Sequence, residues 1–272
     1  MAKARAIVAG EKSRNSMDSK PKHQIYIVSK GRANTPMTAR SFEVEGIDYL
    51  IAVEPQEADE YAKALGKHRL LVLPFSNLGL GSYPARNYCW EHSKAAGHKR
   101  HWMFDDNIDG LSKWTNGLKP RSPKRTKEGI CYVEANATAV DISGFEYRYF
   151  VARPPKRPFK YNCHVYSAML IKNDMPYRWR LKYNEDVDLC LQVLHNGGST
   201  SACVYYMSNK KETSAKMKGG NQDELYKGND PRKKLLKAKM LEAVWPQYAK
   251  TVIRFNRYHH LVDWKVFQKR LS

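Results

Sequence analysis

Two carboxylates and a carboxamide follow a short, largely apolar segment and have the chemistry to bind a cation. Residues 101–104 have the composition of a buried strand, and Asp105, Asp106 and Asn107 come directly after it. Neighbouring carboxylates repel each other unless a counter-charge lies between them. Oxygen ligands suit a hard divalent cation, so these three residues are predicted to hold such an ion together with a metal-bridged diphosphate. The alternative is an ordinary Asp/Asn turn.

A second acidic cluster, at residues 184–188, begins a predicted helix. Carboxylates at a helix N-terminus are favoured by capping and by the helix dipole, so these acids could have a purely structural role. The functional interpretation is that Asp186 or Glu185 projects into the same site. There it would act as a general base that deprotonates an acceptor hydroxyl.

A polar loop after the first predicted strand offers backbone N–H groups and cations to the phosphates or base of a nucleotide. Its spacing matches neither a P-loop nor the GxGxxG of a dinucleotide fold. Two polar residues just inside a later helix could contact the nucleotide sugar, although solvated helix residues would look the same. The predicted nucleotide-binding residues are Ser29, Lys30, Gly31, Arg32, Asn34, Glu54, Arg86, Asn87 and Asp105.

The elements that must hold these residues alternate between strand and helix. Runs at 24–29, 49–54 and 70–73 predict strands, and residues 57–65 have the spacing of an amphipathic helix between two of them. This β-α-β order favours a parallel sheet, and open α/β sheets bind ligands at the carboxyl ends of their strands. Further segments predict helices at 85–96, 184–195 and from Asp230 onward, strands at 163–171 and 201–207, and a mobile basic loop from Ser112 to Lys127.

The charge of the chain indicates a polyanionic partner. Its 272 residues include 47 Lys and Arg against 27 Asp and Glu, a formal net charge of +20. Such an excess favours nucleic acid over an anionic membrane surface, although a basic surface can also be merely solvated. Residues predicted to track a phosphate backbone or stack on bases are Lys113, Trp114, Lys119, Arg121, Lys124, Arg125, Lys127, Arg254, Arg257, His259 and His260.

Cysteine usage and hydropathy indicate the compartment and the domain plan. The five cysteines are widely spaced and form no zinc-binding pattern, so we expect reduced thiols in a cytoplasmic protein. No apolar stretch has the length of a signal peptide or a membrane span, and no membrane partner is expected. We predict a disordered basic tail over 1–22, a catalytic domain over 23–210 and a basic C-terminal extension over 211–272 that packs on it.

Three of these motifs together resemble a GT-A glycosyltransferase. They are the Ser-Lys-Gly-Arg loop at 29–32, the Phe-Asp-Asp-Asn strand end at 104–107 and the Asn-Glu-Asp helix start at 184–186, and the likeness covers about residues 24–207. Within that superfamily the chain looks like the TET-associated glycosyltransferases, phage-type enzymes linked with sugar transfer to oxidised bases such as 5-hydroxymethylcytosine. The resemblance implies a GT-A-like, mixed and mostly parallel α/β sheet flanked by helices, with a basic helical C-terminal extension.

The resemblance also assigns roles to the acidic residues. Asp105, Asp106 and Asn107 take the place of the DXD motif, which holds Mg²⁺ or Mn²⁺ and the ribose of a UDP-sugar. Asn107 departs from that motif, because a carboxamide brings an oxygen but no charge, so the ion would bind weakly. Glu185 and Asp186 match the acidic pair of inverting relatives.

The function predicted from this resemblance is that of a metal-dependent, inverting hexosyltransferase. It would move a sugar from a UDP-sugar to a hydroxyl on 5-hydroxymethylcytosine in double-stranded DNA, or in RNA. The compartment expected for such an enzyme is the cytoplasm of a phage-infected bacterium.

Three other functions share part of this chemistry. A protein O-glycosyltransferase has the same donor site and differs in what its basic surface meets. A nucleotidyltransferase also uses paired acids and a metal, but it releases pyrophosphate. A non-enzymatic nucleic-acid-binding module explains the charge, but not a buried strand that ends in acids.

Overall fold

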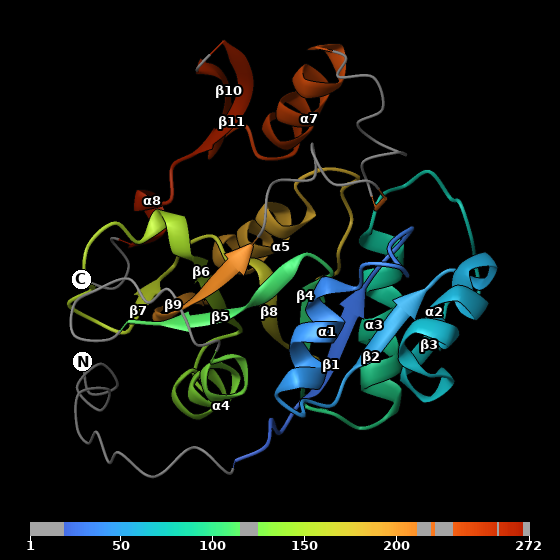
Figure 1. The fold of residues 1–272 in the computed structure, drawn as a ribbon. Coiled ribbons are helices and arrows are strands. Elements are labelled where there is room, and N and C mark those ends of the chain that lie inside the picture. The colour runs from blue at the N-terminus through green and yellow to red at the C-terminus, as the bar shows by residue number, and fades with distance from the viewer. Residues whose placement is uncertain (1–18, 115–124, 211–218, 221–230, 255, 269–272) are drawn as a thin grey trace.

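A nine-stranded sheet forms the centre of the computed structural model, which describes residues 19–114, 125–210, 219–220, 231–254 and 256–268 (Figure 1). The strands lie in the order β3-β2-β1-β4-β8-β6-β9-β5, and β7 pairs with β9. They are β1 (Gln24–Val28), β2 (Leu50–Val53), β3 (Leu70–Val72), β4 (Arg100–Asp105), β5 (Ile108–Lys113), β6 (Ile142–Tyr147), β7 (Phe159–Tyr161), β8 (Tyr166–Lys172) and β9 (Thr200–Lys210).

Six of the nine strands described in this sheet run in the same direction. β1 is parallel to both β2 and β4, β2 is parallel to β3, and β6 is parallel to β9. β8, β5 and β7 run antiparallel to their neighbours. The mixed, mostly parallel α/β sheet is therefore confirmed, and the carboxyl ends of β1, β2, β4 and β9 meet at one edge.

Helices cover both faces of the sheet because side chains alternate along each strand. On β4, Trp102 and Phe104 point to one face and Met103 points to the other. The first face is covered by α1 (Met37–Val44), α2 (Ala58–Leu65) and α4 (Thr126–Asn136), and the second by α3 (Tyr83–Ala95) and α5 (Glu185–His195). Short 3₁₀ turns lie at η1 (Pro55–Glu57), η2 (Lys67–Arg69) and η3 (Arg148–Phe150). None of the described helices is both long enough and apolar enough to cross a membrane.

The C-terminal part of the chain packs against α5 and does not join the central sheet (Figure 1). It consists of α7 (Pro231–Val244), the antiparallel hairpin of β10 (Ala249–Arg254) and β11 (Arg257–Val262), and α8 (Lys265–Gln268). Val187 and Leu191 of α5 share a buried cluster with Leu241, Trp245 and Phe267. The predicted helix is confirmed from Pro231 onward, and Asp230 lies outside the described residues. The hairpin is an element that the sequence did not predict.

The predicted mobile loop from Ser112 to Lys127 is wrong at both of its ends. Ser112 and Lys113 belong to β5, and α4 begins at Thr126; residues 115–124 lie outside the described residues. The flanking apolar residues Leu111 and Ile130 are fully buried in the core, and their burial orders the segments around them.

On the N-terminal side, the backbone amides of Lys22 and His23 bond to the Glu134 carboxylate, so the chain is fixed directly before β1. Residues 1–18 of the predicted tail lie outside the described residues.

Candidate active site

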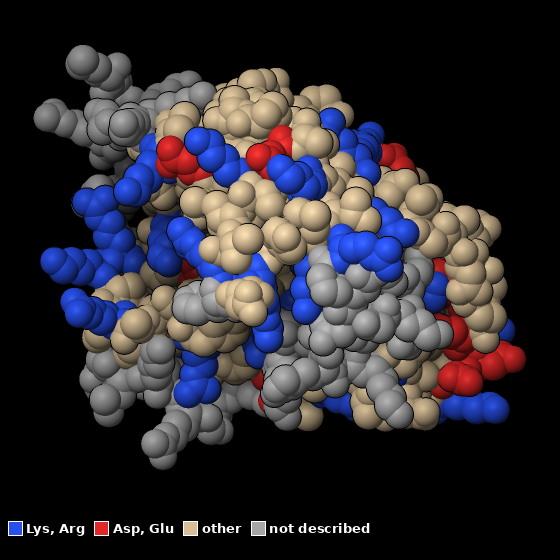
Figure 2. All heavy atoms as spheres, turned by 90° about the horizontal axis from the view of Figure 1, so that it is seen from above, with Lys and Arg blue, Asp and Glu red and all other residues tan. Residues whose placement is uncertain are grey.

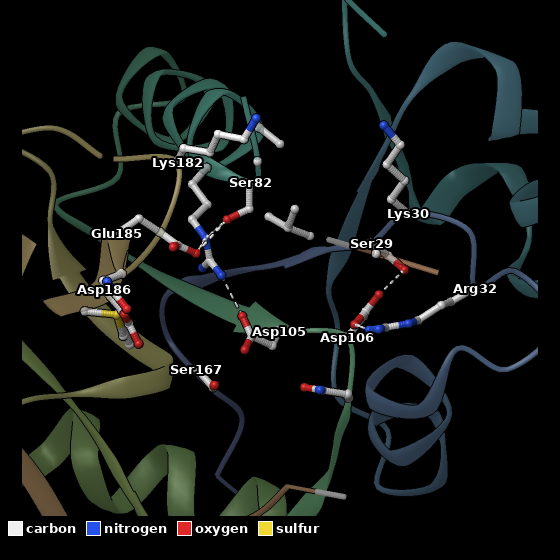
Figure 3. Close-up of a pocket in the computed structure, with 18 of the residues that line it drawn as sticks. Ser29, Lys30, Arg32, Ser82, Asp105, Asp106, Ser167, Lys182, Glu185 and Asp186 are labelled. Atoms are coloured by element: carbon white, nitrogen blue, oxygen red, sulfur yellow. Dashed lines mark hydrogen bonds and ion pairs between the residues drawn. The ribbon is translucent and has the colours of Figure 1, made fainter. Parts of the chain in front are cut away.

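A cleft opens at the sheet edge where β1, β2, β4 and β9 end, and α5 begins beside it (Figure 3). Residues far apart in the sequence meet there, as expected if the motifs form one site. The predicted residues that line the cleft are Ser29, Lys30, Arg32, Glu54, Arg86, Asp105, Asp106, Asn107, Glu185 and Asp186.

Asp105 lies between two cationic side chains. Its Oδ1 accepts a hydrogen bond of 2.6 Å from an Arg86 guanidinium nitrogen, and its Oδ2 accepts one of 2.9 Å from Lys210 Nζ. Burial alone would raise the pKa of Asp105, but the Lys210 and Arg86 charges outweigh it and hold the pKa well below its ordinary value. Asp105 is therefore an ionised carboxylate with both oxygens occupied.

Asp106 turns toward the loop after β1. Its Oδ1 pairs with the Arg32 guanidinium and its Oδ2 accepts a hydrogen bond of 2.7 Å from Ser29 Oγ. Burial raises the pKa of Asp106 above its ordinary value, although the Arg32 charge opposes this. The side chain of Asp106 thus fastens the predicted nucleotide-binding loop to the end of β4.

Two further charged side chains, Lys30 and Glu54, lie along this side of the cleft. Lys30 Nζ lies 3.0 Å from Glu54 Oε1, and the other Glu54 oxygen accepts hydrogen bonds from Gln56 Nε2 and the Asn77 backbone amide. These bonds lower the pKa of Glu54, against the opposing effect of burial. The result is a hydrogen-bonded rim in which a carboxylate and an ammonium group lie side by side.

The predicted metal ligands do not fit a resident divalent ion in this arrangement. Asp105 is occupied by two cations and Asp106 by one, so an incoming ion would meet positive charge on both carboxylates. Among the described residues, no three His, Cys, Asp or Glu side chains come together as metal ligands. Of the side-chain oxygens of the three predicted ligands, only Asn107 Oδ1 is unpaired: it is buried and has no hydrogen-bond partner among the described residues. A single uncharged oxygen suits a ligand hydroxyl better than a six-coordinate ion.

The two predicted base candidates lie at the first turn of α5, opposite Asp105. Glu185 Oε1 accepts a 2.7 Å hydrogen bond from Ser82 Oγ and lies 3.6 Å from Arg86 Nε, while Asp186 Oδ2 lies 3.1 Å from His164 Nε2. Burial raises the pKa of Glu185. For Asp186, burial is outweighed by the His164 contact, which holds the pKa below its ordinary value. The two neighbouring carboxyl groups thus differ in pKa, which is raised for Glu185 and lowered for Asp186.

Three of the predicted nucleotide-binding residues do not line the cleft. Asn34 is exposed, and both amide atoms of Asn87 bond to the Trp179 backbone, so Asn87 holds the segment before α5. Gly31, at φ +67°, donates its N–H to Glu57, and a Cβ here would approach Gly219 Cα to 3.2 Å. That close approach accompanies a 2.6 Å bond from the Gly220 amide to the Lys30 carbonyl.

The predicted nucleic-acid residues around β5 and α4 are partly engaged elsewhere. Lys113 Nζ and an Arg125 guanidinium nitrogen pair with Glu128 at 2.7 and 3.0 Å, and the Lys127 backbone amide bonds to Glu45. Glu128 therefore neutralises part of the positive charge that was predicted to contact nucleic acid. Trp114 packs against the buried cluster of Val151, Val204 and Met207. Lys119, Arg121 and Lys124 lie outside the described residues.

The hairpin of β10 and β11 presents the remaining predicted nucleic-acid residues. Arg254, Arg257 and His259 are exposed, whereas His260 is half-buried and burial lowers its pKa to about 4. His260 is therefore neutral at pH 7 and brings no charge to a phosphate. Lys and Arg are more widespread than Asp and Glu over the face of the molecule in Figure 2, which views it from above.

Several residues that line the cleft were not predicted. They are Ser82, Tyr147, Ser167, Lys182, Lys210 and Lys237, among others. Lys210 ends β9, and a parallel sheet brings that end to the same edge as Asp105, so the strand predicted at 201–207 contained a usable signal. Lys182 and Lys237 carry no such signal, because loop and helix lysines are ordinary surface residues.

One comparison with known proteins identifies a family. The family model described as TET-associated glycosyltransferase matches residues 23–220, which include all of the cleft except Lys237. No curated protein matches the chain. Among solved structures, the chain is similar to a candidate nucleotide-diphospho-sugar transferase from Desulfovibrio desulfuricans G20, with 12% sequence identity, a TM-score of 0.37, and coverage of 65% of this chain and 78% of that chain.

Proposed function

The chain belongs to the TET-associated glycosyltransferase family, and we propose that it transfers a sugar from a UDP-sugar to the hydroxyl of 5-hydroxymethylcytosine in DNA. A nucleotide-sugar donor carries a diphosphate, and the cleft offers that anion the cations of the loop after β1 and of α3. The net charge of +20 supports a polyanionic acceptor.

The single observation that carries this proposal is that Asp105, Asp106, Glu185 and Asp186 line one cleft together with basic side chains. The acids at the end of β4 lie beside cations suited to the donor diphosphate. The acids of α5 lie on the other side of the cleft, where an acceptor hydroxyl would approach (Figure 3). A donor and an acceptor can therefore meet between them.

The reaction proposed is a single displacement with inversion. The acceptor oxygen attacks the anomeric carbon while the bond from that carbon to the diphosphate oxygen breaks, and the electron pair leaves with the nucleoside diphosphate. The hydroxyl proton passes to the Asp186 carboxylate, with Glu185 as the alternative acceptor. The hydroxyl becomes acidic as its new bond forms, so an ionised carboxylate of low pKa can still take the proton.

An acceptor base in duplex DNA has to leave the base stack to bring its hydroxymethyl group into this cleft. The exposed cations of the β10–β11 hairpin, Arg254 and Arg257, are proposed to hold the flanking phosphates. The divalent ion expected from the sequence is not part of this proposal, because the carboxylates it would use are paired with cations.

The test is incubation with a panel of UDP-sugars and DNA that contains 5-hydroxymethylcytosine, followed by nucleoside mass spectrometry. One gain of a hexose mass on that nucleoside identifies donor and acceptor together. Asp186→Asn is expected to lower kcat by about 10²-fold or more, as loss of a general base does. Transfer to peptides but not to DNA, or release of pyrophosphate, would replace this proposal with the corresponding alternative.

A further inference from the structure

The charges that line the cleft differ from those of a divalent-metal site. Six basic side chains, those of Lys30, Arg32, Arg86, Lys182, Lys210 and Lys237, accompany five carboxylates, those of Glu54, Asp105, Asp106, Glu185 and Asp186. The described lining therefore has one positive charge in excess before any ligand arrives. A site for a divalent cation needs the opposite balance, because its charge is compensated by anionic oxygen ligands.

Lys210 is the best-fixed of these cations. All three donors of its ammonium group are used, by Asp105 Oδ2 at 2.9 Å, Ser167 Oγ at 2.7 Å and Tyr147 Oη at 3.1 Å. Its side chain is only 16% exposed. Burial would lower the pKa of Lys210, but the Asp105 charge and the Tyr147 hydroxyl hold it above its ordinary value. Lys210 therefore remains charged, and its ammonium group is held in one position by three hydrogen bonds.

Arg86 is held almost as firmly on the other oxygen of Asp105. Its Nε donates to Ser82 Oγ at 3.0 Å, and its guanidinium lies 4.8 Å from the centre of the Trp179 ring. Only 8% of its side chain is exposed. Arg86 and Lys210 thus present two preorganised positive charges on either side of one carboxylate.

Lys182 completes the set from the segment before α5. It lines the cleft, and no ion pair or hydrogen bond of its ammonium group is found among the described residues. Figure 3 draws it among the side chains that line the cleft. Its charge is available to a ligand without the loss of an existing partner.

We propose that Lys210 and Arg86, assisted by Lys182, neutralise the donor diphosphate, so that the cleft needs no divalent metal ion for transfer. This inference rests on the proposed function and concerns the donor side of the same cleft. When the bond between the anomeric carbon and the phosphate oxygen breaks, the electron pair adds one negative charge to the leaving group. Fixed cations in a partly buried site stabilise that charge without rearranging, and loss of one such group typically costs about 10²- to 10³-fold in kcat.

Calorimetric titration of UDP and of UMP into the full-length protein tests the inference without any dependence on turnover. One set of titrations contains EDTA and another contains Mn²⁺. UDP is expected to bind in EDTA, with a Kd within about threefold of that in Mn²⁺, a difference of well under 1.4 kcal/mol. Sugar transfer is measured under the same two conditions and is expected to be equally insensitive to EDTA.

Variants at Lys210 test whether its charge contributes to binding of the diphosphate. Lys210→Met is expected to weaken UDP binding about tenfold or more while UMP binding changes little, since the lost charge acts on the β-phosphate. Lys210→Arg keeps the charge and is expected to recover part of the UDP affinity, and circular dichroism establishes that both variants fold. Lys160→Met is the matched control, because Lys160 pairs with Glu146 and does not line the cleft; it should bind both nucleotides like the parent protein.

The results separate a failure of the inference from a failure of the proposed function. UDP binding that appears only with Mn²⁺ would overturn the inference and leave the proposed donor class intact. Unchanged UDP affinity in a folded Lys210→Met protein would also overturn it. If UDP fails to bind under either condition, the proposed function itself fails.

Discussion

The indole Nε1 of Trp245 donates a hydrogen bond of 2.7 Å to Oδ1 of Asp188. The Asp188 side chain is completely buried and also accepts hydrogen bonds from Arg180 and Gln192. Because Asp188 lies two positions after Asp186 on α5, Trp245 of the C-terminal part helps to fix the helix that carries the proposed base.

Trp245→Phe should therefore destabilise the protein. The substitution removes the donor and leaves part of a buried charge unsatisfied, so the free energy of unfolding is expected to fall by about 1–3 kcal/mol in a denaturant titration. Trp114→Phe is the control, since the Trp114 indole N–H is buried without a hydrogen-bond partner among the described residues. Equal losses in the two variants would contradict a role for the Trp245 hydrogen bond.

Stability should fall on mild acidification because of His101. Burial lowers the pKa of His101 from 6.5 to about 4, and its ring bonds to the Asn173 side chain within the core. Between these two pH values the unfolded chain binds a proton that the folded protein does not, so stability increases with pH in this window. The loss from pH 7 to pH 4 is expected to be about 3 kcal/mol for this residue.

The measurement for His101 compares denaturation midpoints of the parent protein and of His101→Phe across that pH window. The Phe variant keeps an aromatic ring in the core but has no group to protonate. Its stability should decline less steeply from pH 6.5 to pH 4, and parallel curves would argue that His101 does not titrate there.

DNA binding should depend on salt through the hairpin arginines. Replacing both Arg254 and Arg257 with Ala is expected to weaken binding at low salt and to reduce the slope of log K against log salt by about 2. Transfer to the free hydroxymethylated nucleoside should be unchanged, because neither residue lines the cleft. Arg40→Ala with Arg69→Ala is the control, since these arginines pair with Glu43 and Asp48. An equal effect of both double variants would mean that only total charge matters.

Gly144 should be intolerant of a side chain. A Cβ there would lie 2.1 Å from the Ala168 carbonyl oxygen and 2.5 Å from Val165 Cγ1, so β6 would have to move away from β8. Gly144→Ala is expected to lower the free energy of unfolding by about 3 kcal/mol, at the upper end for overpacking. Gly46→Ala meets no atom within 4 Å and is strained only by its φ of +62°, at a cost of about 1–2 kcal/mol. A lower melting temperature for Gly46→Ala than for Gly144→Ala would contradict the close approach of β6 and β8 at Gly144.

Elements with a clean hydrophobic period were predictable. β1, β2, β4 and α5 match the segments expected from their apolar spacing. β5 was missed because Gly110 and polar neighbours interrupt its pattern, and α4 was missed because its basic start resembles the loop before it. The hairpin of β10 and β11 is half exposed and rich in cations, so its period-2 signal is weak.

The cleft was predictable where polar residues directly follow predicted strands, as Ser29 and Asp105 do. Ser167 reaches the same place only through the antiparallel pairing of β8 with β4 and β6, which single-sequence patterns do not specify. Asn87 was predicted to contact a nucleotide but does not line the cleft. A helix asparagine that bonds to a neighbouring backbone, as Asn87 does to Trp179, cannot be distinguished in the sequence from one that contacts a ligand.

The bond from the Gly220 amide to the Lys30 carbonyl also constrains the order of events during synthesis. The loop that carries Lys30 leaves the ribosome early, but its backbone partner is made only after the last strand of the sheet. A nascent chain therefore cannot finish this rim of the cleft until translation has passed Gly220. Premature termination inside the sheet would yield fragments that carry the acidic turn of β4 without this rim of the cleft.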